Sequence, residues 1–285
     1  MNSFSSAATT VAPRLQALKE FALSELRANA ADRAHAEMAE ERLPFTIRLV
    51  SDENALSKAV QVRHAAYARH VPDFAEALRM PEANDFENGV AVLLAESKLD
   101  GSPLGTMRIQ TNRHKPLTLE KSLALPQWLH DSSLAEATRL AVANDATSRV
   151  VKTALFKAFF LYCQQQSIEW MVITARAPID RQYERLMFED VYPGLGYVPM
   201  AHVNNLPHRV LSFEVGMARA RWEDANHPMQ NFFCETVHPD IMISGSPVAE
   251  KRHSGVSLGK NPLSNKASDS MATRREITTA AMIAT

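Results

Sequence analysis

The segment Leu134–Val142 carries polar residues where a buried strand would be apolar. It reads Leu-Ala-Glu-Ala-Thr-Arg-Leu-Ala-Val, and most of its residues suit the core of a sheet. Glu136 and Arg139 do not, because burying a charge without a partner is costly. Such a strand either lies at the edge of a sheet or builds a site, where a carboxylate can move a proton and a guanidinium can bind a carboxylate.

Two elements after this segment indicate how such a site would be positioned. Residues 149–166 have the spacing of an amphipathic helix, and Trp170–Thr174 is a short apolar run that suits a central strand. A strand, a polar site, a helix and a second strand in this order predict a cleft between neighbouring strands.

The composition excludes several classes of protein. The 285 residues carry a formal charge of -1, so no overall field attracts nucleic acid or a membrane surface. No apolar run approaches the ~20 residues that span a bilayer, and the N-terminus does not resemble a secretory signal. The two cysteines, Cys163 and Cys234, show neither a disulfide framework nor zinc spacing. We therefore expect a cytoplasmic protein that binds no metal.

The chain divides into four regions by composition. Residues 1–12 are rich in Ser, Ala and Thr and are expected to be flexible. Residues 13–43 favour an N-terminal helix, which Pro44 ends. Residues 45–242 form the compact domain, and residues 245–285, which contain no aromatic ring of Phe, Trp or Tyr, are expected to be a disordered tail.

Within the compact domain, alternating apolar residues predict strands and helical spacing predicts helices. The predicted strands are 46–50, 90–95, 104–110, 134–142, 170–174, one opening at 195–198, and 208–215, and the predicted helices are 54–70, 149–166 and 179–188.

This order resembles that of the GNAT acyltransferase superfamily over residues 45–216. The turn at Asp100-Gly101, the Glu136–Val142 strand and the Tyr192-Pro-Gly-Leu-Gly-Tyr197 turn are similar to parts of that fold. The resemblance implies an α/β fold with a mixed, mainly antiparallel central sheet flanked by helices, to which the N-terminal helix and the C-terminal tail are added.

Four motifs resemble the long-chain N-acyl amino acid synthases and the related acyl-homoserine lactone synthases. They are Arg63-His-Ala-Ala-Tyr67, Glu82-Ala-Asn-Asp85, Leu104-Gly-Thr-Met-Arg108 and Glu136-Ala-Thr-Arg139. The lactone synthases also carry a tryptophan in the early loop for S-adenosylmethionine, and residues 71–88 contain none. The resemblance therefore favours an N-acyl amino acid synthase, with a lactone synthase or an inactive acyl-carrier or lipid-binding module as alternatives.

The resemblance assigns roles to these side chains. Glu136 and Thr138 would be catalytic, as proton acceptor and orienting hydroxyl. The substrate-binding residues would be Arg63, Tyr67, Asp85, Arg108 and Arg139. Simpler structural roles remain open, since Glu136 with Arg139, or Arg63 with Asp85, can equally form internal ion pairs.

The donor is inferred from a departure from the superfamily pattern. The turn Asn144–Arg149 has no glycine, and a backbone cradle for the pyrophosphate of coenzyme A without glycine is sterically awkward. We therefore expect no permanently bound cofactor, and acyl-phosphopantetheine on acyl carrier protein as the donor. Acyl carrier proteins are acidic, so the docking candidates are basic: Arg149, Lys152, Arg181 and Arg185.

The remaining partner would be an amino acid acceptor. No transmembrane segment is expected, although weak membrane association through the product or the N-terminal helix is left open. An acyl tunnel would need apolar residues, and the candidates, each also explained by core packing, are Met107, Leu134, Phe156, Phe159, Phe160, Met171 and Met187.

Overall fold

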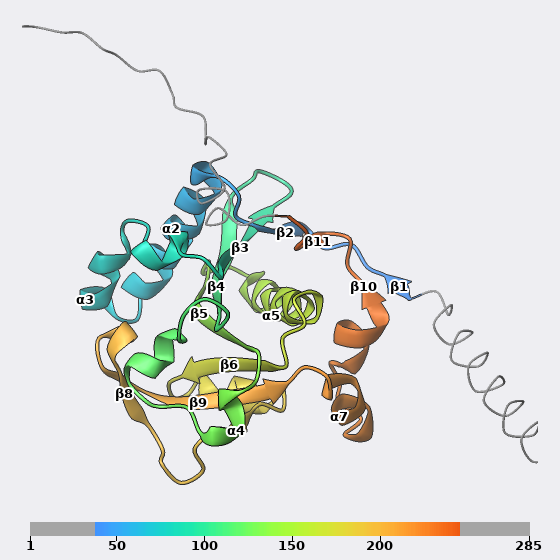
Figure 1. Ribbon diagram of the computed structural model, residues 1–285. Coiled ribbons are helices and arrows are strands. Elements are labelled where there is room, and N and C mark those ends of the chain that lie inside the picture. The colour runs from blue at the N-terminus through green and yellow to red at the C-terminus, as the bar shows by residue number, and fades with distance from the viewer. Residues whose placement is uncertain (1–37, 246–285) are drawn as a thin grey trace, which may run out of the picture.

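The computed structural model describes residues 38–245, and a single large sheet runs through this part of the chain (Figure 1). Its nine strands follow the order β11-β2-β3-β4-β5-β6-β9-β7, and β8 pairs with β9 outside this path. The strands are β2 (Phe45–Leu49), β3 (Val90–Ser97), β4 (Pro103–Thr111), β5 (Leu134–Val142), β6 (Trp170–Ala175), β7 (Glu189–Asp190), β8 (Val198–Met200), β9 (Leu206–Glu214) and β11 (Ile241–Met242).

The helices include short 3-10 segments and one π-helix. The α-helices are α2 (Glu53–Ala68), α3 (Pro72–Ala75), α4 (Gln127–His130), α5 (Ser148–Gln165), α6 (Asp180–Glu184) and α7 (Ala218–Asp224). The 3-10 helices are η1 (Glu76–Leu78), η2 (Ala83–Phe86), η3 (Thr118–Lys121) and η4 (Ala201–Val203), and the π-helix is η5 (Asn231–Glu235). No helix within residues 38–245 is long and apolar enough to cross a membrane.

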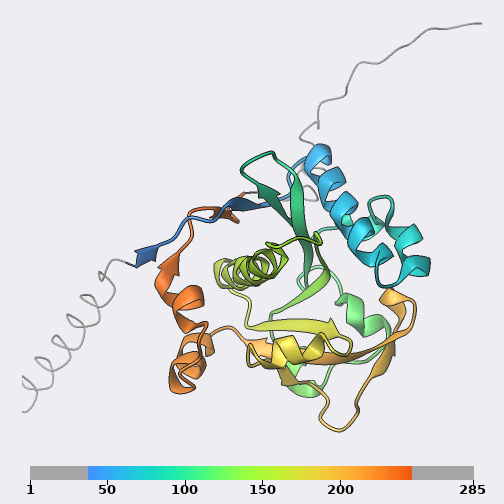
Figure 2. The same ribbon diagram turned by 180° about the vertical axis from the view of Figure 1, so that it is seen from behind.

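The two long helices cover opposite faces of the sheet (Figures 1 and 2). Alternate residues of β3 divide between them, because successive side chains of a strand point to opposite faces. Ala91 and Leu93 belong to the core under α5, whereas Val92 and Leu94 pack with Leu56 of α2. Strands β2, β3, β4 and β5 are antiparallel to one another, whereas β11 is parallel to β2, and β5 and β6 are parallel and connected through α5.

The parallel pair β5 and β6 separates after four residue pairs. The ladder runs from Leu134 opposite Trp170 to Ala137 opposite Ile173, and both strands continue beyond it. Strand β6 pairs with β9 along the whole length of β6, from Trp170 to Ala175. Strand β6 therefore follows β9 and diverges from β5. The divergence opens the sheet between two of its central strands, as the order of elements predicted.

The predicted order of strands and helices is confirmed, with differences at the ends of elements. The N-terminal helix was predicted to continue to residue 43, but residues 39–40 form strand β1 (Ala39–Glu40), which pairs with β10 (Thr236–Val237). Residues 1–37 and 246–285 lie outside the described residues, as do the flexible segment, most of that helix and most of the tail predicted there. The helix predicted at 179–188 is wrong at its C-terminal end, because α6 stops at Glu184 and β7 begins at Glu189.

Candidate active site

A cavity of about 320 Å³ occupies the gap between β5 and β6. It is lined by residues 138–142 of β5 and by residues 174–176 at the end of β6. Tyr67 of α2 and His202 of η4 border it on one face of the sheet, and Lys152 of α5 and Tyr183 of α6 border it on the other. The cavity is therefore reached from both faces, an arrangement that lets two substrates meet at one point.

A β-bulge in β5 lies at the wall of this cavity. Arg108 pairs with Thr138 and Thr106 pairs with Ala141, so two residues of β5, including Arg139, face one residue of β4. The backbone of Arg139 has φ of +55°, a left-handed conformation that costs a residue with a side chain about 1–3 kcal/mol. The bulge directs the Arg139 side chain toward the α2 face of the sheet, beside Thr138.

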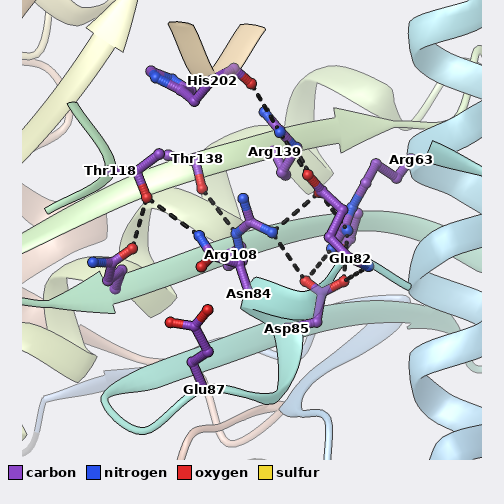
Figure 3. Close-up of polar contacts among 12 residues, drawn as sticks. Arg63, Glu82, Asn84, Asp85, Glu87, Arg108, Thr118, Thr138, Arg139 and His202 are labelled. Carbon is purple, nitrogen blue, oxygen red and sulfur yellow. Dashed lines mark hydrogen bonds and ion pairs between the residues drawn. The ribbon is translucent and has the colours of Figure 1, made fainter. Parts of the chain in front are cut away.

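Three arginines converge on two carboxylates behind this wall (Figure 3). Arg63 donates to both oxygens of Asp85, at 2.9 and 3.1 Å. Arg139 donates to both oxygens of Glu82, from Nε at 2.8 Å and from Nη2 at 2.7 Å. Arg108 reaches both acids, with Nη1 3.1 Å from Glu82 and 3.3 Å from Asp85.

This Arg63–Glu82–Asp85–Arg108–Arg139 cluster has one more positive than negative formal charge. Burial opposes ionisation of Glu82, but the hydrogen bond from Arg139 and the neighbouring guanidinium charges lower its pKa to about 2. Nη1 of Arg139 is buried without a partner among the described residues, and Arg139 borders the cavity. The cluster is therefore suited to an additional anion, which would complete the hydrogen bonding of this guanidinium.

The residues predicted to bind substrate divide into two groups. Tyr67 and Arg139 border the cavity. Arg63, Asp85 and Arg108 do not border it; they are almost completely buried and bind one another and Glu82. Their predicted direct contact with substrate is not supported by this geometry, since their side chains are occupied in positioning Arg139 and the η2 segment.

Thr138 lies in the cavity wall, where its hydroxyl oxygen accepts a hydrogen bond from Arg108 Nε at 3.2 Å. Glu136, the predicted proton acceptor, does not border the cavity and is fully buried. Its Oε2 accepts from the backbone N–H of Leu119 at 3.2 Å, because η3 covers this part of β5. Burial raises the pKa of Glu136 to about 7. Glu136 is therefore not a lining residue of this cavity, and its Oε1 is buried without a partner among the described residues. Its catalytic role stays a prediction.

The internal ion pair between Glu136 and Arg139, which was the structural alternative for β5, is not formed. The partner of Arg139 is Glu82. Arg63 and Asp85, by contrast, do form the ion pair that was the structural alternative for them. The role of Glu82 as the acid that binds all three arginines was not predicted, although Glu82 belongs to the acidic motif. The signal for it in the sequence was its position three residues before Asp85.

Among the predicted docking residues, Lys152 borders the cavity and its ammonium group contacts the side-chain oxygen of Gln182. This contact joins α5 to α6. Arg149, Arg181 and Arg185 are exposed on the same two helices. Of the four basic candidates, Lys152 is the one that lines the cavity among the described residues.

The seven apolar residues predicted to line an acyl tunnel do not border the cavity. Most of them belong to the packed core between α5 and the sheet, in line with the alternative of core packing. Leu140, Val142 and Ile179 supply apolar surface at the cavity itself.

Sequence reasoning also missed several polar residues of the cavity, because they follow no motif. They are Arg69 and His70 at the end of α2, Thr174 and Arg176 at the end of β6, and Gln182 of α6. His202 and His208, beside β8 and β9, also line the cavity. Within the described residues the lining contains no aspartate or glutamate. In the same range, 38–245, no group of three or more metal-binding side chains is present. The cavity is consequently positive and suits anionic substrates.

Comparison with known proteins identifies a family that the sequence matches. Residues 58–202, which are 145 of the 285 residues, match the family described as N-acyl amino acid synthase FeeM. Among solved structures, FeeM itself, an N-acyl amino acid synthase from uncultured soil microbes, aligns with a TM-score of 0.51 and 18% identity over 66% of this chain and 96% of its own. This likeness confirms the GNAT-like α/β fold.

Two further solved structures align less well. BjaI, a coenzyme A-dependent acyl-homoserine lactone synthase, has a TM-score of 0.46 and 15% identity over 74% of this chain and 99% of its own. A putative N-acetyltransferase from Lactobacillus plantarum has a TM-score of 0.44 and 12% identity over 61% and 99%. No curated protein matches the sequence.

The family match includes all four motifs of the sequence and the cavity residues Tyr67, Thr138, Arg139 and His202. Since it spans more than half of the sequence, the chain belongs to the FeeM family of N-acyl amino acid synthases and is an acyltransferase.

Proposed function

We propose that this enzyme moves a long-chain fatty acyl group from acyl carrier protein to the amine of an amino acid. The supporting observation is that Arg139, whose buried Nη1 has no partner among the described residues, lines a cavity that has no carboxylate of its own within those residues. An amino acid carboxylate at this nitrogen would complete the guanidinium's hydrogen bonding. It would also hold the amine beside the gap between β5 and β6.

The reaction joins the acceptor nitrogen to the thioester carbon. The attacking amine adds to the carbonyl, the C–S bond then breaks, and the thiol leaves with a proton. Backbone N–H groups at the β5 bulge, where the ladder with β6 has ended, are placed to stabilise the tetrahedral oxyanion. Thr138, held by Arg108, would orient the thioester.

The proposed donor side is the opening between α5 and α6. Leu140, Val142 and Ile179 give it apolar surface for the start of the acyl chain. Arg149, Arg181 and Arg185 are exposed around it and suit an acidic carrier protein. The sequence Asn144–Arg149 before α5 lacks the glycines of a pyrophosphate cradle, which favours a donor with a single phosphate.

The test uses the purified full chain with a long-chain acyl group on acyl carrier protein and a panel of amino acids. Mass spectrometry should detect an N-acyl amino acid that depends on the enzyme. The same acyl group on coenzyme A should give at least about tenfold lower kcat/KM, because the carrier's acidic surface is missing. Equal rates with both donors would contradict the carrier proposal alone. Formation of an acyl-homoserine lactone with S-adenosylmethionine, and no N-acyl amino acid, would contradict the proposed acceptor.

A further inference from the structure

The cavity lining offers histidine side chains, and no carboxylate, as acceptors of a proton near neutral pH, within the part of the chain that the structure describes. Its lining includes three histidines, His70, His202 and His208, and no aspartate or glutamate. An amino acid presents an ammonium group at pH 7, and this group must lose a proton before it can attack a thioester. Glu136 is buried under η3, and Lys152, which also lines the cavity, contacts Gln182 through its ammonium group, so the histidines are the candidates that we consider for taking this proton.

His208 of β9 and Arg139 of β5 line the same cavity. Strand β9 pairs with β6 in a register that places Arg209 opposite Ala175, so His208 lies just beyond the end of β6. Its neighbour Arg209 points to the other face, where it binds carboxylates of α6 and β7. The alternation of β9 therefore directs His208 to the face that carries Thr174 and His202.

The hydrogen bonding of His208 fixes which nitrogen can accept a proton. Its Nδ1 lies 2.8 Å from the carbonyl oxygen of Leu206, and a carbonyl only accepts, so Nδ1 carries the hydrogen. In the neutral ring the lone pair is then on Nε2. No described residue donates a hydrogen bond to Nε2. A substrate N–H in the cavity can therefore reach a free acceptor.

The two other histidines are less suitable. His70 is exposed at the outer end of the cavity, beside the end of α2. His202 lies next to Arg139, and burial together with that positive charge lowers its pKa to about 3, so it is a weak base. Its Nε2 is also 3.3 Å from the hydroxyl of Thr174.

The groups around His208 keep its ring neutral. The charged or titratable side chains that share the cavity are Arg176 after β6, Arg139 of β5, His202 of η4, Tyr67 of α2, Arg69 and His70 after α2, Lys152 of α5, and Tyr183 of α6. Burial lowers the pKa of His208, and the charge of Arg176 lowers it further, although the hydrogen bond to Leu206 acts in the opposite direction. The unprotonated form, which a general base requires, therefore predominates at pH 7.

We propose that His208 is the general base of the acyl transfer, and this proposal rests on the proposed function. Nε2 takes a proton from the acceptor ammonium group, which leaves a neutral amine and an imidazolium. The amine attacks the thioester carbon, the nitrogen of the tetrahedral intermediate loses its second proton to solvent, and the imidazolium returns the first proton to the sulfur as the C–S bond breaks. His208 lies outside residues 58–202, so the family match does not assign this role.

The test compares two acceptors with wild-type enzyme and His208→Gln. One acceptor is an amino acid, and the other is its aminooxy analogue, whose nitrogen is already neutral at pH 7. With the amino acid, His208→Gln should lower kcat about 100-fold or more at pH 7, and the loss should shrink as the pH rises. With the aminooxy analogue, the variant and the wild type should have similar kcat.

Two controls separate this role from a structural one. His64→Gln alters a histidine of α2 that borders a different groove, and it should leave kcat unchanged with both acceptors. Added imidazole should restore part of the turnover that His208→Ala loses with the amino acid. It should not change the turnover of His64→Ala, because that variant is expected to keep its activity.

The outcomes distinguish the two proposals. Wild-type turnover with unchanged kcat and pH profile in His208→Gln overturns the general-base role and leaves the proposed function intact. Equal losses with both acceptors also overturn it, because they indicate a structural role. Absence of product from the wild type with every donor and amino acid refutes the proposed function and the role of His208 with it.

Discussion

Arg139 and Glu82 form a two-point ion pair, in which Nε and Nη2 of the arginine donate to the two carboxylate oxygens at 2.8 and 2.7 Å. The pair joins the bulge of β5 to the segment before η2 and leaves Nη1 of Arg139 unpartnered beside the cavity. A strained backbone and a fixed guanidinium thus occur at the same residue. We conclude that the cluster positions this third nitrogen.

Removal of the Glu82 charge should destabilise the protein. Glu82 accepts hydrogen bonds from Arg63, Arg108 and Arg139, so Glu82→Gln leaves three arginines with Asp85 as their only acid. We expect the free energy of unfolding to fall by about 3 kcal/mol, measured by urea denaturation at pH 7. The control Glu76→Gln removes an exposed acid paired with Arg79 and should leave the free energy of unfolding nearly unchanged.

The pH dependence gives a second measure of the same pair. The pKa of Glu82 is lowered to about 2 in the folded protein, so its contribution is complete above pH 4.5 and is lost as the pH falls toward 2. The difference in stability between wild type and Glu82→Gln should therefore disappear over this window. A difference that stays constant down to pH 2 would contradict the ion pair.

Replacement of Arg139 should impair recognition of the acceptor carboxylate. Arg139→Lys keeps the positive charge but cannot bind Glu82 at two points and also present a third nitrogen. We expect the KM for the amino acid to rise at least about tenfold, while the KM for the acyl donor changes little. Steady-state kinetics with each substrate varied separately would measure both constants.

An acceptor without a carboxylate is the matched control for Arg139. The amino alcohol related to the preferred amino acid should be a poor substrate of the wild type. With Arg139→Lys, the difference between the two acceptors should largely vanish. If the variant still prefers the amino acid as strongly as the wild type, Arg139 does not bind the carboxylate.

Glu136→Gln tests whether this buried acid is catalytic. Gln resembles the protonated acid and can still accept the hydrogen bond from Leu119. We expect kcat to stay within about threefold of wild type, whereas loss of a general base costs about 100-fold or more. A loss of that size would restore the catalytic role predicted from sequence.

The stability of Glu136→Gln should also depend on pH. Burial raises the pKa of Glu136 to about 7, so the folded wild type holds this proton between pH 4.5 and 7 and loses stability as the pH rises through that window. The variant lacks this loss. Relative to wild type, it should gain on the order of 3 kcal/mol between pH 4.5 and pH 8 in urea denaturation. A constant difference would show that the carboxyl titrates normally.

Charge reversal around the donor side should weaken carrier docking. Arg149→Glu and the double variant Arg181→Glu/Arg185→Glu should raise the KM for acyl carrier protein about tenfold, and high salt should do the same to the wild type. The KM for an acyl group on free pantetheine should not change. Arg79→Glu, at an exposed residue far from α5 and α6 in sequence, is the control. An equal effect of all these variants would exclude a specific docking surface.

Gly105 of β4 is required by the close approach of α5. A Cβ atom there would lie 2.7 Å from Val151 and 3.0 Å from Leu155, and also 3.3 Å from the Ala141 carbonyl of β5. We expect Gly105→Ala to lower the free energy of unfolding by about 2 kcal/mol. Gly216→Ala, with open space around the added atom, should have little effect on the thermal midpoint. Equal midpoints for both variants would contradict this packing.

The sequence by itself determined the order of the strands and long helices, because burial leaves a local pattern. Alternation in β3 and the spacing of apolar residues in α5 each follow from the face that an element presents to the core. Glu136 and Arg139 were found as charges in a segment that is otherwise apolar, whereas Arg63 and Arg108 were found through the resemblance of their motifs to those of a family.

Only the tertiary structure decided which of these side chains reach the cavity. Glu136 and Thr138 point to the same face of β5, yet β6 departs after Ala137 and η3 covers Glu136, so only Thr138 borders the opening. His208 also reaches the cavity, because the register of β9 on β6 places it just beyond the end of β6. Strand divergence and register depend on contacts between segments distant in sequence, and a local pattern carries no information about them.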